Sequence, residues 1–276
     1  MEQVINKPLV SIVTVCFNSE KMIRQTIESV LNQTYTNIEY ILVDGKSTDS
    51  TVAIIEEYAP LFAERGIQYQ WVSEPDTGMY NAINKGFLLS SGEIMCWINS
   101  DDFFLFDYSI KQVVAAFVLY PEADWISFFP VAYSESGETF GLPSIFAPFS
   151  QYLIKRGYYH DRGLGFIQQE STFWRRKVYR LSGGYVDESY KYAGDFDLWR
   201  RFAEHVPLYK INNCVSGFRK HELQKTSNIE NYYAEISKFI NWKSKLVFWF
   251  KHFIKVFLLL TNKRFNLNSI NITKIK

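Results

Sequence analysis

The sequence predicts an α/β protein whose mainly parallel sheet is flanked by helices. Two observations support this prediction. Short apolar runs rich in β-branched residues alternate with segments whose apolar residues recur at helical spacing. A polar cluster follows each of the first four apolar runs. Such alternation is typical of parallel strands joined by helices, and ligands of these sheets bind at the carboxyl ends of the strands.

The expected elements follow one another closely through the first hundred residues. Strands are expected at 9–16, 38–43, 67–72 and 93–98. Helices are expected from a cap at Asn18-Ser19 to Leu31, from a cap at 47–49 to Tyr58, and over Met79–Leu89. The polar clusters after these strands either converge on one cleft or are only turns and helix caps. Residues 130–165 show no clear period, and we expect long loops and short elements there.

Composition excludes several classes of protein. With 276 residues, 47% of them hydrophobic, the chain can bury a sizeable core. A net charge of +1 argues against a general nucleic-acid binder, which needs many surplus cations. Cys16, Cys96 and Cys214 lie far apart, so neither a zinc site nor a disulfide framework is expected. The first residues lack a secretory signal, and we expect a cytoplasmic protein.

Two adjacent carboxylates, Asp101 and Asp102, follow the fourth expected strand. Carboxylates held this close repel one another unless a cation or a proton compensates them. Oxygen ligands suit Mg²⁺ or Mn²⁺, whose shell is typically completed by water and substrate phosphates. The pair therefore predicts a divalent metal and a nucleotide diphosphate. The alternative is that it caps the helix that follows.

A second acidic cluster, Asp195 and Asp197, opens an apolar-periodic segment that begins at Leu198. The two carboxylates point in different directions on a helical turn. One of them can face a cleft while the other caps the helix or pairs with Arg200 or Arg201. Displacement of a nucleotide diphosphate by an alcohol needs a general base, which Asp195 could supply.

The ordered set of motifs resembles the family 2 inverting glycosyltransferases of the GT-A fold. The segments 11–18, 43–51, 73–86 and 99–102 read SIVTVCFN, VDGKSTDST, SEPDTGMYNAINKG and NSDD, and GDFDL at 194–198 resembles the downstream acidic motif. The likeness runs from about residue 8 to 225. It implies a GT-A-like catalytic domain and sugar transfer from a nucleotide-sugar donor, with inversion at the anomeric carbon.

The resemblance also implies roles for individual residues on the donor side. It places Phe17 and Asn18 against the base and ribose, Asp44 near the uracil-reading loop, and Asp76 and Asn84 at the donor pocket. Asp101 would lie near the ribose or metal, and Asp102 would be the principal metal ligand. On the acceptor side, Asp195 would be the base that deprotonates the acceptor hydroxyl. Many members carry two acidic residues after the second strand, whereas Asp44 is followed by Gly45. The carboxylate that usually reads the base is therefore missing or replaced at this position, and uridine remains the favoured base.

Further residues are assigned by resemblance to the sugar and phosphate sides. Gln169 and Glu170 would bond sugar hydroxyls, although a polar strand end explains them equally well. Arg219 and His221 fall where related enzymes place a loop that closes over the diphosphate, and a cationic loop there would neutralise the departing phosphate. A structural role for the histidine is the alternative.

We expect a catalytic domain over residues 1–230 and a basic amphipathic segment over 231–276. From Lys238 onward there are nine Lys or Arg and no Asp or Glu. Within 242–260, large apolar residues recur at helical spacing on one side and lysines gather on the other. This pattern is typical of a helix lying in an anionic membrane surface, here the cytoplasmic face. The alternative is a helix packed on the catalytic domain or on a second subunit of a homo-oligomer.

Together these features predict a glycosyltransferase that uses a nucleotide-sugar donor and Mn²⁺ or Mg²⁺. The acceptor is expected to be a saccharide, free or lipid-linked, in cell-surface polysaccharide or glycolipid assembly. Two other classes remain open. A sugar-1-phosphate nucleotidyltransferase would usually carry a glycine-rich basic loop after the first strand, where this chain has 16–19 as CFNS. A non-catalytic saccharide- or lipid-binding scaffold would not need Asp101, Asp102 and Asp195.

Overall fold

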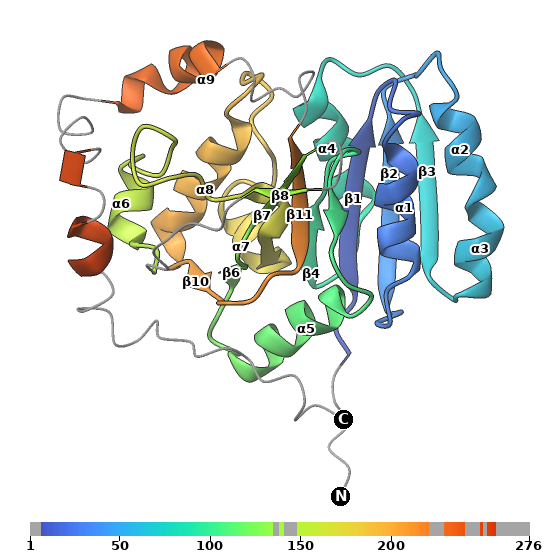
Figure 1. The fold of residues 1–276 in the computed structure, drawn as a ribbon, viewed down its shortest axis with the longest axis horizontal. Helices are drawn as coiled ribbons and strands as arrows, with labels where there is room; N and C mark the ends of the chain where they lie inside the picture. Colours follow the sequence, from blue (N-terminus) through green and yellow to red (C-terminus); the bar gives the residue numbers. More distant parts are fainter. Residues whose placement is uncertain are drawn as a thin grey trace, which may run out of the picture.

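A mixed sheet forms the centre of the protein. The computed structural model describes residues 7–134, 138–140, 148–220, 229–240, 249–250 and 253–257. Within this part of the chain, seven strands pair in the order β10-β6-β9-β4-β1-β2-β3 (Figure 1). β1 is parallel to β2 and β4, and β2 is parallel to β3. The prediction of a mainly parallel sheet with flanking helices is thus confirmed.

The strands of this sheet lie at β1 (Val10–Cys16), β2 (Ile38–Asp44), β3 (Gln68–Ser73), β4 (Ile94–Trp97), β6 (Trp125–Ser127), β9 (Thr172–Arg175) and β10 (Tyr209–Lys210). A second sheet, of order β5-β11-β7-β8, consists of β5 (Phe103–Phe104), β7 (Val131–Ser134), β8 (Thr139–Phe140) and β11 (Ser216–Lys220). The described helices are α1 (Ile23–Leu31), α2 (Thr51–Glu57), α3 (Ala59–Glu64), α4 (Met79–Leu89), α5 (Ser109–Leu119), α6 (Gln151–Lys155), α7 (Arg176–Leu181), α8 (Gly194–His205) and α9 (Ile229–Ile236), with the 3-10 turns η1 (Gln169–Ser171) and η3 (Ser237–Phe239).

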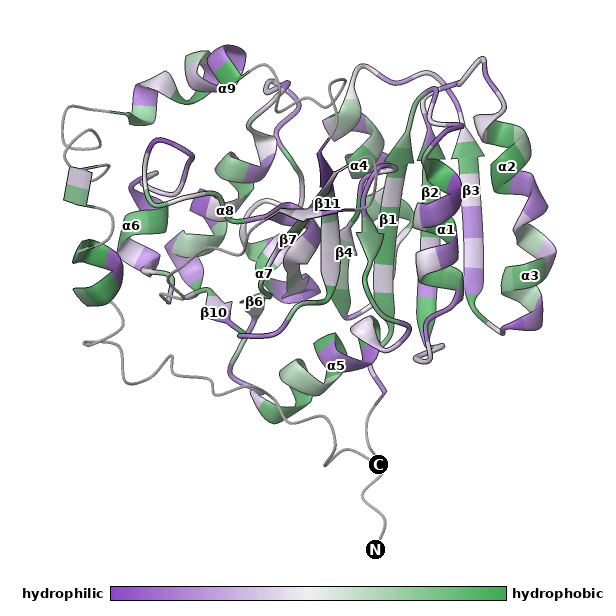
Figure 2. Cartoon of the chain, viewed as in Figure 1, coloured by the Kyte–Doolittle hydropathy of each residue, from purple (hydrophilic) through white to green (hydrophobic). Residues whose placement is uncertain are grey.

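Both faces of the central sheet are buried. Successive side chains of a strand point to opposite faces, so Ile12 of β1 joins one apolar core while Val13 joins the other. The first core contains residues of α1, α2, α3 and α5, and the second contains residues of α4, α7, α8 and α9. Figure 2 shows β1 as largely hydrophobic and the edge strand β3 as more polar. Burial on both sides is why the inner strands read as continuous apolar runs.

Most predicted elements of the first hundred residues lie within two residues of the observed ones, and α4 has the predicted bounds. One expected cap is wrong. Asn18-Ser19 does not cap α1, which begins at Ile23 after Met22 and has no side-chain cap. Asn18 instead has a φ of 48°, the left-handed region that asparagine tolerates better than most residues. It shapes the loop between β1 and α1.

The reversed direction of β9 was not expected. β9 lies between β4 and β6 and is antiparallel to both. Its first residues therefore lie at the edge of the sheet where β4 ends. This places η1, which directly precedes β9, beside the carboxyl end of β4.

The boundary expected after residue 230 falls inside α9. Tyr232 and Ile236 of this helix are buried in the same apolar core as Phe196 and Trp199 of α8. In Figure 1, α9 lies above α8, away from the edge of the sheet formed by β3. The first part of the expected C-terminal segment is therefore packed on the domain that holds α8.

No helix within the described ranges is both long enough and apolar enough to cross a bilayer.

Candidate active site

A cavity of about 810 Å³ opens where β1 and β4 end. Its walls come from segments far apart in the sequence, namely residues 15–22, parts of 76–82, parts of 97–101, residues 166–170 and the region of Asp195. The polar clusters that follow β1, β3 and β4 all contribute to this lining. The cluster that follows β2 reaches it through Asp49, while Asp44 is not among the lining residues.

The loop after β1 presents an aromatic ring at the cavity. Asn18 accepts a hydrogen bond from the backbone N–H of Thr48 through Oδ1 (2.9 Å) and donates its own N–H to the Ser47 hydroxyl (2.8 Å). These bonds fix the turn while the neighbouring Phe17 remains 61% exposed. An exposed phenyl ring at the cavity wall offers a face on which a flat heterocycle can stack.

Asp44 shapes this loop from within the protein. Its side chain is fully buried, and Oδ2 accepts hydrogen bonds from the Ser47 N–H (2.9 Å) and the Ser73 hydroxyl (2.6 Å). The Ser47 hydroxyl donates to Oδ1. Because these contacts occupy both carboxylate oxygens, Asp44 ties β2 and β3 to the loop and does not face the cavity.

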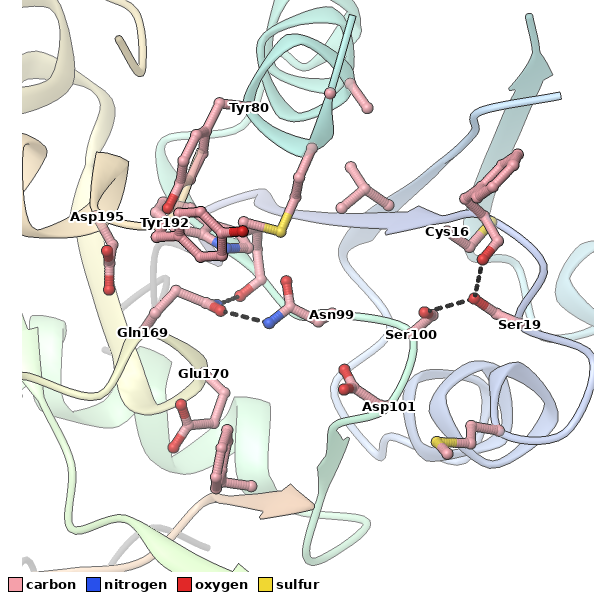
Figure 3. A pocket seen from close by; sticks show the side chains of 18 of the residues that line it. Cys16, Ser19, Tyr80, Asn99, Ser100, Asp101, Gln169, Glu170, Tyr192 and Asp195 are labelled. Atoms are coloured by element: carbon pink, nitrogen blue, oxygen red, sulfur yellow. Dashed lines mark hydrogen bonds between the residues drawn. The ribbon is translucent and has the colours of Figure 1, made fainter. Parts of the chain in front are cut away.

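The two carboxylates after β4 have different surroundings. Asp101 lines the cavity, as Figure 3 shows, whereas Asp102 is only 1% exposed and is not among the lining residues. Oδ1 of Asp102 accepts a hydrogen bond from the backbone N–H of Arg219 (3.2 Å), and Oδ2 accepts one from the Asn99 amide (3.2 Å). Burial, followed by the charges of Asp101 and Glu170, raises the pKa of Asp102. Of the two neighbouring carboxylates, Asp101 therefore lines the cavity and Asp102 is buried.

The turn η1 brings Gln169 and Glu170 to the cavity wall. The Gln169 amide donates to the carbonyl of Trp97, and its Oε1 accepts from Asn99 (3.1 Å), so this side chain ties η1 to the end of β4. Glu170 is 3% exposed. Burial raises the pKa of Glu170 to about 7, and the charges of Asp195 and Asp101 also raise it.

Asp195 lies in the first turn of α8, on the side of the cavity away from Asp101 in the view of Figure 3. Burial, then the charge of Glu235, raises its pKa to about 6. The hydroxyl of Tyr80 is in hydrogen-bond contact with the backbone of Gly194 and Asp195. A Cβ at Gly194 would lie only 2.7 Å from the Tyr80 ring, so the close approach requires glycine.

The neighbouring Asp197 has a different partner. Its carboxylate forms an ion pair with Arg201 (2.7 Å), one helical turn further on. Arg201 also donates to the carbonyls of Ser182 and Tyr185. Asp197 is therefore held by Arg201, and it is not among the residues that line the cavity.

Of the residues predicted for the site, seven line the cavity: Phe17, Asn18, Asp76, Asp101, Gln169, Glu170 and Asp195. Asp44, Asn84, Asp102 and Arg219 do not. His221 lies outside the described residues.

Asn84 and Arg219 have structural partners elsewhere. Asn84 donates to the Val186 carbonyl (2.8 Å) and to Glu188 (2.7 Å), and it thereby holds the loop before α8. The Arg219 side chain donates to Gln25 of α1 and lies over the Phe103 ring, 5.4 Å from its centroid. Neither was distinguishable from a ligand-binding residue by its motif alone.

Several lining residues were not predicted. Tyr80 and Tyr192 lie close to Asp195, and Tyr232 of α9 completes that wall (Figure 3 shows the first two). Tyr80 was within a recognised motif, at 73–86, which could have signalled its role. Tyr232 follows every recognised motif, and the local sequence contains no signal for it.

The sequence of the chain is similar to that of known glycosyltransferases. An uncharacterized glycosyltransferase of Mycobacterium tuberculosis is 37% identical over 110 residues, which are 40% of this chain and 40% of the relative. The match thus spans about two fifths of that relative. An uncharacterized glycosyltransferase of Rickettsia typhi is 25% identical over 258 residues, covering 89% of this chain and 76% of the relative.

A solved structure shows the same fold. S. aureus TarS 1–349, in complex with UDP-GlcNAc, superposes with a TM-score of 0.65 at 17% identity, covering 94% of this chain and 76% of that chain. The GT-A-like fold predicted from the motifs is confirmed. The family model described as Glycosyl transferase family 2 matches residues 11–180, which is more than half of the chain. The protein therefore belongs to glycosyl transferase family 2.

Proposed function

We propose that the protein is an inverting glycosyltransferase that moves a sugar from a nucleotide-sugar donor, preferentially a UDP-sugar, onto an acceptor hydroxyl. The observation that supports this most directly is one cavity lined by Phe17, Asp101 and Asp195. These residues supply an aromatic face for a base, a carboxylate for a metal-bound diphosphate and a carboxylate for the acceptor proton. The family membership and the fold shared with TarS also support the proposal.

The donor is proposed to bind along the ends of β1 and β4. Stacking of a base on an aromatic ring contributes about 1–3 kcal/mol, and Phe17 is exposed enough to provide it. The hydroxyls of Ser19 and Ser100 are hydrogen-bonded to each other across the cavity wall (2.9 Å). This pair joins the loop after β1 to the loop after β4, so base-binding and phosphate-binding segments are held at a fixed separation.

The residues on the cavity wall fit a divalent cation of the Mn²⁺ or Mg²⁺ kind. Such ions bind through one or two protein carboxylates together with water and substrate phosphates. Asp101 lines the cavity, and the described residues contain no cluster of three or more His, Cys, Asp or Glu that could enclose a metal. A bound cation would be held by Asp101 and would neutralise charge on the departing diphosphate. Burial raises the pKa of Asp102 and of Glu170 first, and the charges of neighbouring carboxylates raise both further, an effect that a cation bound beside Asp101 would counteract.

Asp195 is proposed as the general base. With a pKa of about 6 it is mostly ionised at neutral pH, yet it is a stronger base than an ordinary aspartate. Its carboxylate takes the proton of the acceptor hydroxyl as that oxygen forms a bond to the anomeric carbon. The bond from the anomeric carbon to the phosphate oxygen breaks, and the nucleoside diphosphate leaves with its electron pair. A single displacement of this kind inverts the anomeric configuration.

Turnover of UDP-, GDP- and dTDP-sugars, with the anomeric configuration of the product read by proton NMR, tests the proposal. We expect release of a nucleoside diphosphate, fastest from a UDP-sugar, and a product of inverted configuration. Formation of a nucleotide-sugar and pyrophosphate from a sugar phosphate and a nucleoside triphosphate would instead identify a nucleotidyltransferase. Binding without turnover of any donor would indicate a scaffold.

The acceptor is proposed to be a lipid-linked saccharide of cell-surface polysaccharide or glycolipid assembly, reached from the cytoplasmic face of the membrane. The support lies in the described part of the C-terminal segment. Trp249, Phe250, Phe253 and Phe257 are each more than half exposed, whereas Ile254 packs on the second apolar core. A row of exposed large apolar side chains in a basic segment is typical of a membrane-surface helix.

Replacing Phe250, Phe253 and Phe257 together with Ser is expected to weaken binding to anionic liposomes at least tenfold. Each phenyl side chain loses a transfer energy of up to about 1.5–3 kcal/mol. Flotation at low and high salt measures the effect, with wild-type binding weakening as salt rises. Leu88→Ser, at an 83% exposed position on α4, is the matched control. Unchanged flotation of the triple variant contradicts membrane binding through these side chains, and dissociation of an oligomer would identify a subunit contact.

A further inference from the structure

The carboxylate of Glu235, on α9, binds the backbone immediately before Asp195. Oε1 accepts a hydrogen bond from the N–H of Lys191 (2.7 Å), and Oε2 accepts from the N–H groups of Tyr192 (2.9 Å) and Ala193 (2.9 Å). Three consecutive backbone donors thus converge on one side chain. Hydrogen bonds to an ionised acceptor are about twice as strong as those between neutral groups.

The N-terminus of α8 has no side-chain cap of its own. α8 begins at Gly194, and the preceding cap residue is Ala193, whose side chain has no acceptor. An N-terminus of this kind lacks the Ser, Thr, Asp or Asn that usually satisfies the first backbone donors. From α9, Glu235 accepts the N–H of the cap residue Ala193 and of the two residues before it, and its negative charge is favourable beside the positive end of the α8 dipole.

Tyr80 of α4 contacts the backbone directly after the residues that Glu235 binds. The Tyr80 hydroxyl is in hydrogen-bond contact with Gly194 and Asp195, and the Tyr80 ring leaves room only for a glycine at 194. Residues 191–195 therefore contact both α9, through Glu235, and α4, through Tyr80. α9 itself is anchored by Tyr232 and Ile236, which are 6% and 0% exposed in the apolar core.

We infer that Glu235 is a positioning residue for Asp195 and that α9 is part of the catalytic machinery. This inference rests on the proposed function, in which Asp195 is the general base. Its consequence for the organisation of the chain is that the catalytic unit extends beyond residue 230 and includes the start of the basic C-terminal segment. Glu235 acts through the backbone of residues 191–193 and has no direct contact with the acceptor.

The charge of Glu235 also bears on the protonation of Asp195. The titratable groups that face or lie near Asp195 are Tyr80 from α4, Glu170 from η1, Tyr192 from the loop before α8, and Tyr232 and Glu235 from α9. Of these, Glu235 is the carboxylate whose charge raises the pKa of Asp195. Removing that charge lowers this pKa, so the acidic limb of the rate profile moves to lower pH.

Glu235→Gln and Glu235→Ala in the full chain test the inference. Gln keeps one acceptor oxygen and the side-chain length, whereas Ala removes the contact. We expect kcat to fall roughly tenfold or more, because a small displacement of a catalytic group is costly, while the Kd for UDP stays within about twofold. We also expect the acidic limb of kcat/KM to shift to lower pH in both variants. Glu230→Gln, on the exposed side of α9, is the matched control.

The outcomes separate this inference from the proposed function. If Asp195→Asn is fully active, the base assignment fails, whatever the Glu235 variants do. If Asp195→Asn is inactive while both Glu235 variants keep the wild-type kcat and an unshifted acidic limb, only the present inference is overturned. If Glu235→Ala does not fold, Glu235→Gln decides: a lower kcat with an unchanged Kd for UDP supports the inference, and a wild-type kcat overturns it.

Discussion

Asp195→Asn is expected to reduce transfer by about 10²-fold or more while donor binding is retained. Asn cannot accept the acceptor proton, and loss of a general base typically costs this much. In the wild-type protein, kcat/KM should fall about tenfold per pH unit below a pKa of about 6, since protonated Asp195 cannot act as a base. Initial rates across the pH range and calorimetric titration with UDP measure both effects.

Asp197→Asn is the matched control for this prediction. Asp197 lies two residues away on the same helical turn, but its carboxylate is paired with Arg201. We expect its replacement to lower the melting temperature slightly and to leave the acidic limb in place. If Asp197→Asn abolished transfer and Asp195→Asn did not, the base would be misassigned.

Asp101→Asn is expected to weaken Mn²⁺-dependent binding of UDP by at least tenfold and to abolish most transfer. Changes around bound metals commonly cost 10–100-fold in affinity or activity. The reason is that Asp101 is the carboxylate of the pair that lines the cavity. Titration of UDP in the presence of Mn²⁺ and in the presence of a chelator measures the metal-dependent part of the affinity.

Asp102→Asn distinguishes the role of Asp102 from that of the neighbouring Asp101. The oxygens of Asp102 accept from the Arg219 backbone and from Asn99, so its replacement should act mainly on thermal stability and on the join between β4 and β11. Suppose that the Asp102→Asn protein bound UDP equally well with and without Mn²⁺, while Asp101→Asn kept the wild-type metal dependence. The metal ligand would then be Asp102 and not Asp101.

The sequence predicted β1, β2 and β4 well because these strands are buried on both faces. Such strands must be apolar along their whole length, and the alternation with amphipathic helices leaves few other arrangements. The convergence of polar clusters was also predictable, because the carboxyl ends of parallel strands meet at one edge. Asn18, Asp76 and Asp101 lie at the cavity for this reason.

What the sequence could not predict depends on partners far away in the chain. Asp44 and Asn84 have the residue types of a ligand site, yet serines and the loop at 186–188 satisfy them. The contact of Glu235 with residues 191–193 joins segments more than 40 positions apart and leaves no local pattern. This contact forms only when α9 packs against the loop before α8 in the folded chain.

The reversed strand β9 has a consequence for how the two substrates can vary. A parallel strand delivers the residues that follow it to the binding edge, but β9 delivers the residues that precede it, including Gln169 and Glu170. Apart from Gln169, which is bonded to the end of β4, the chain leading up to β9 can therefore change in length or composition while the pairing of β4, β9 and β6 keeps its register. The wall opposite the proposed nucleotide site can diverge in this way, so the proposed acceptor could differ between related proteins without a change in the proposed donor site.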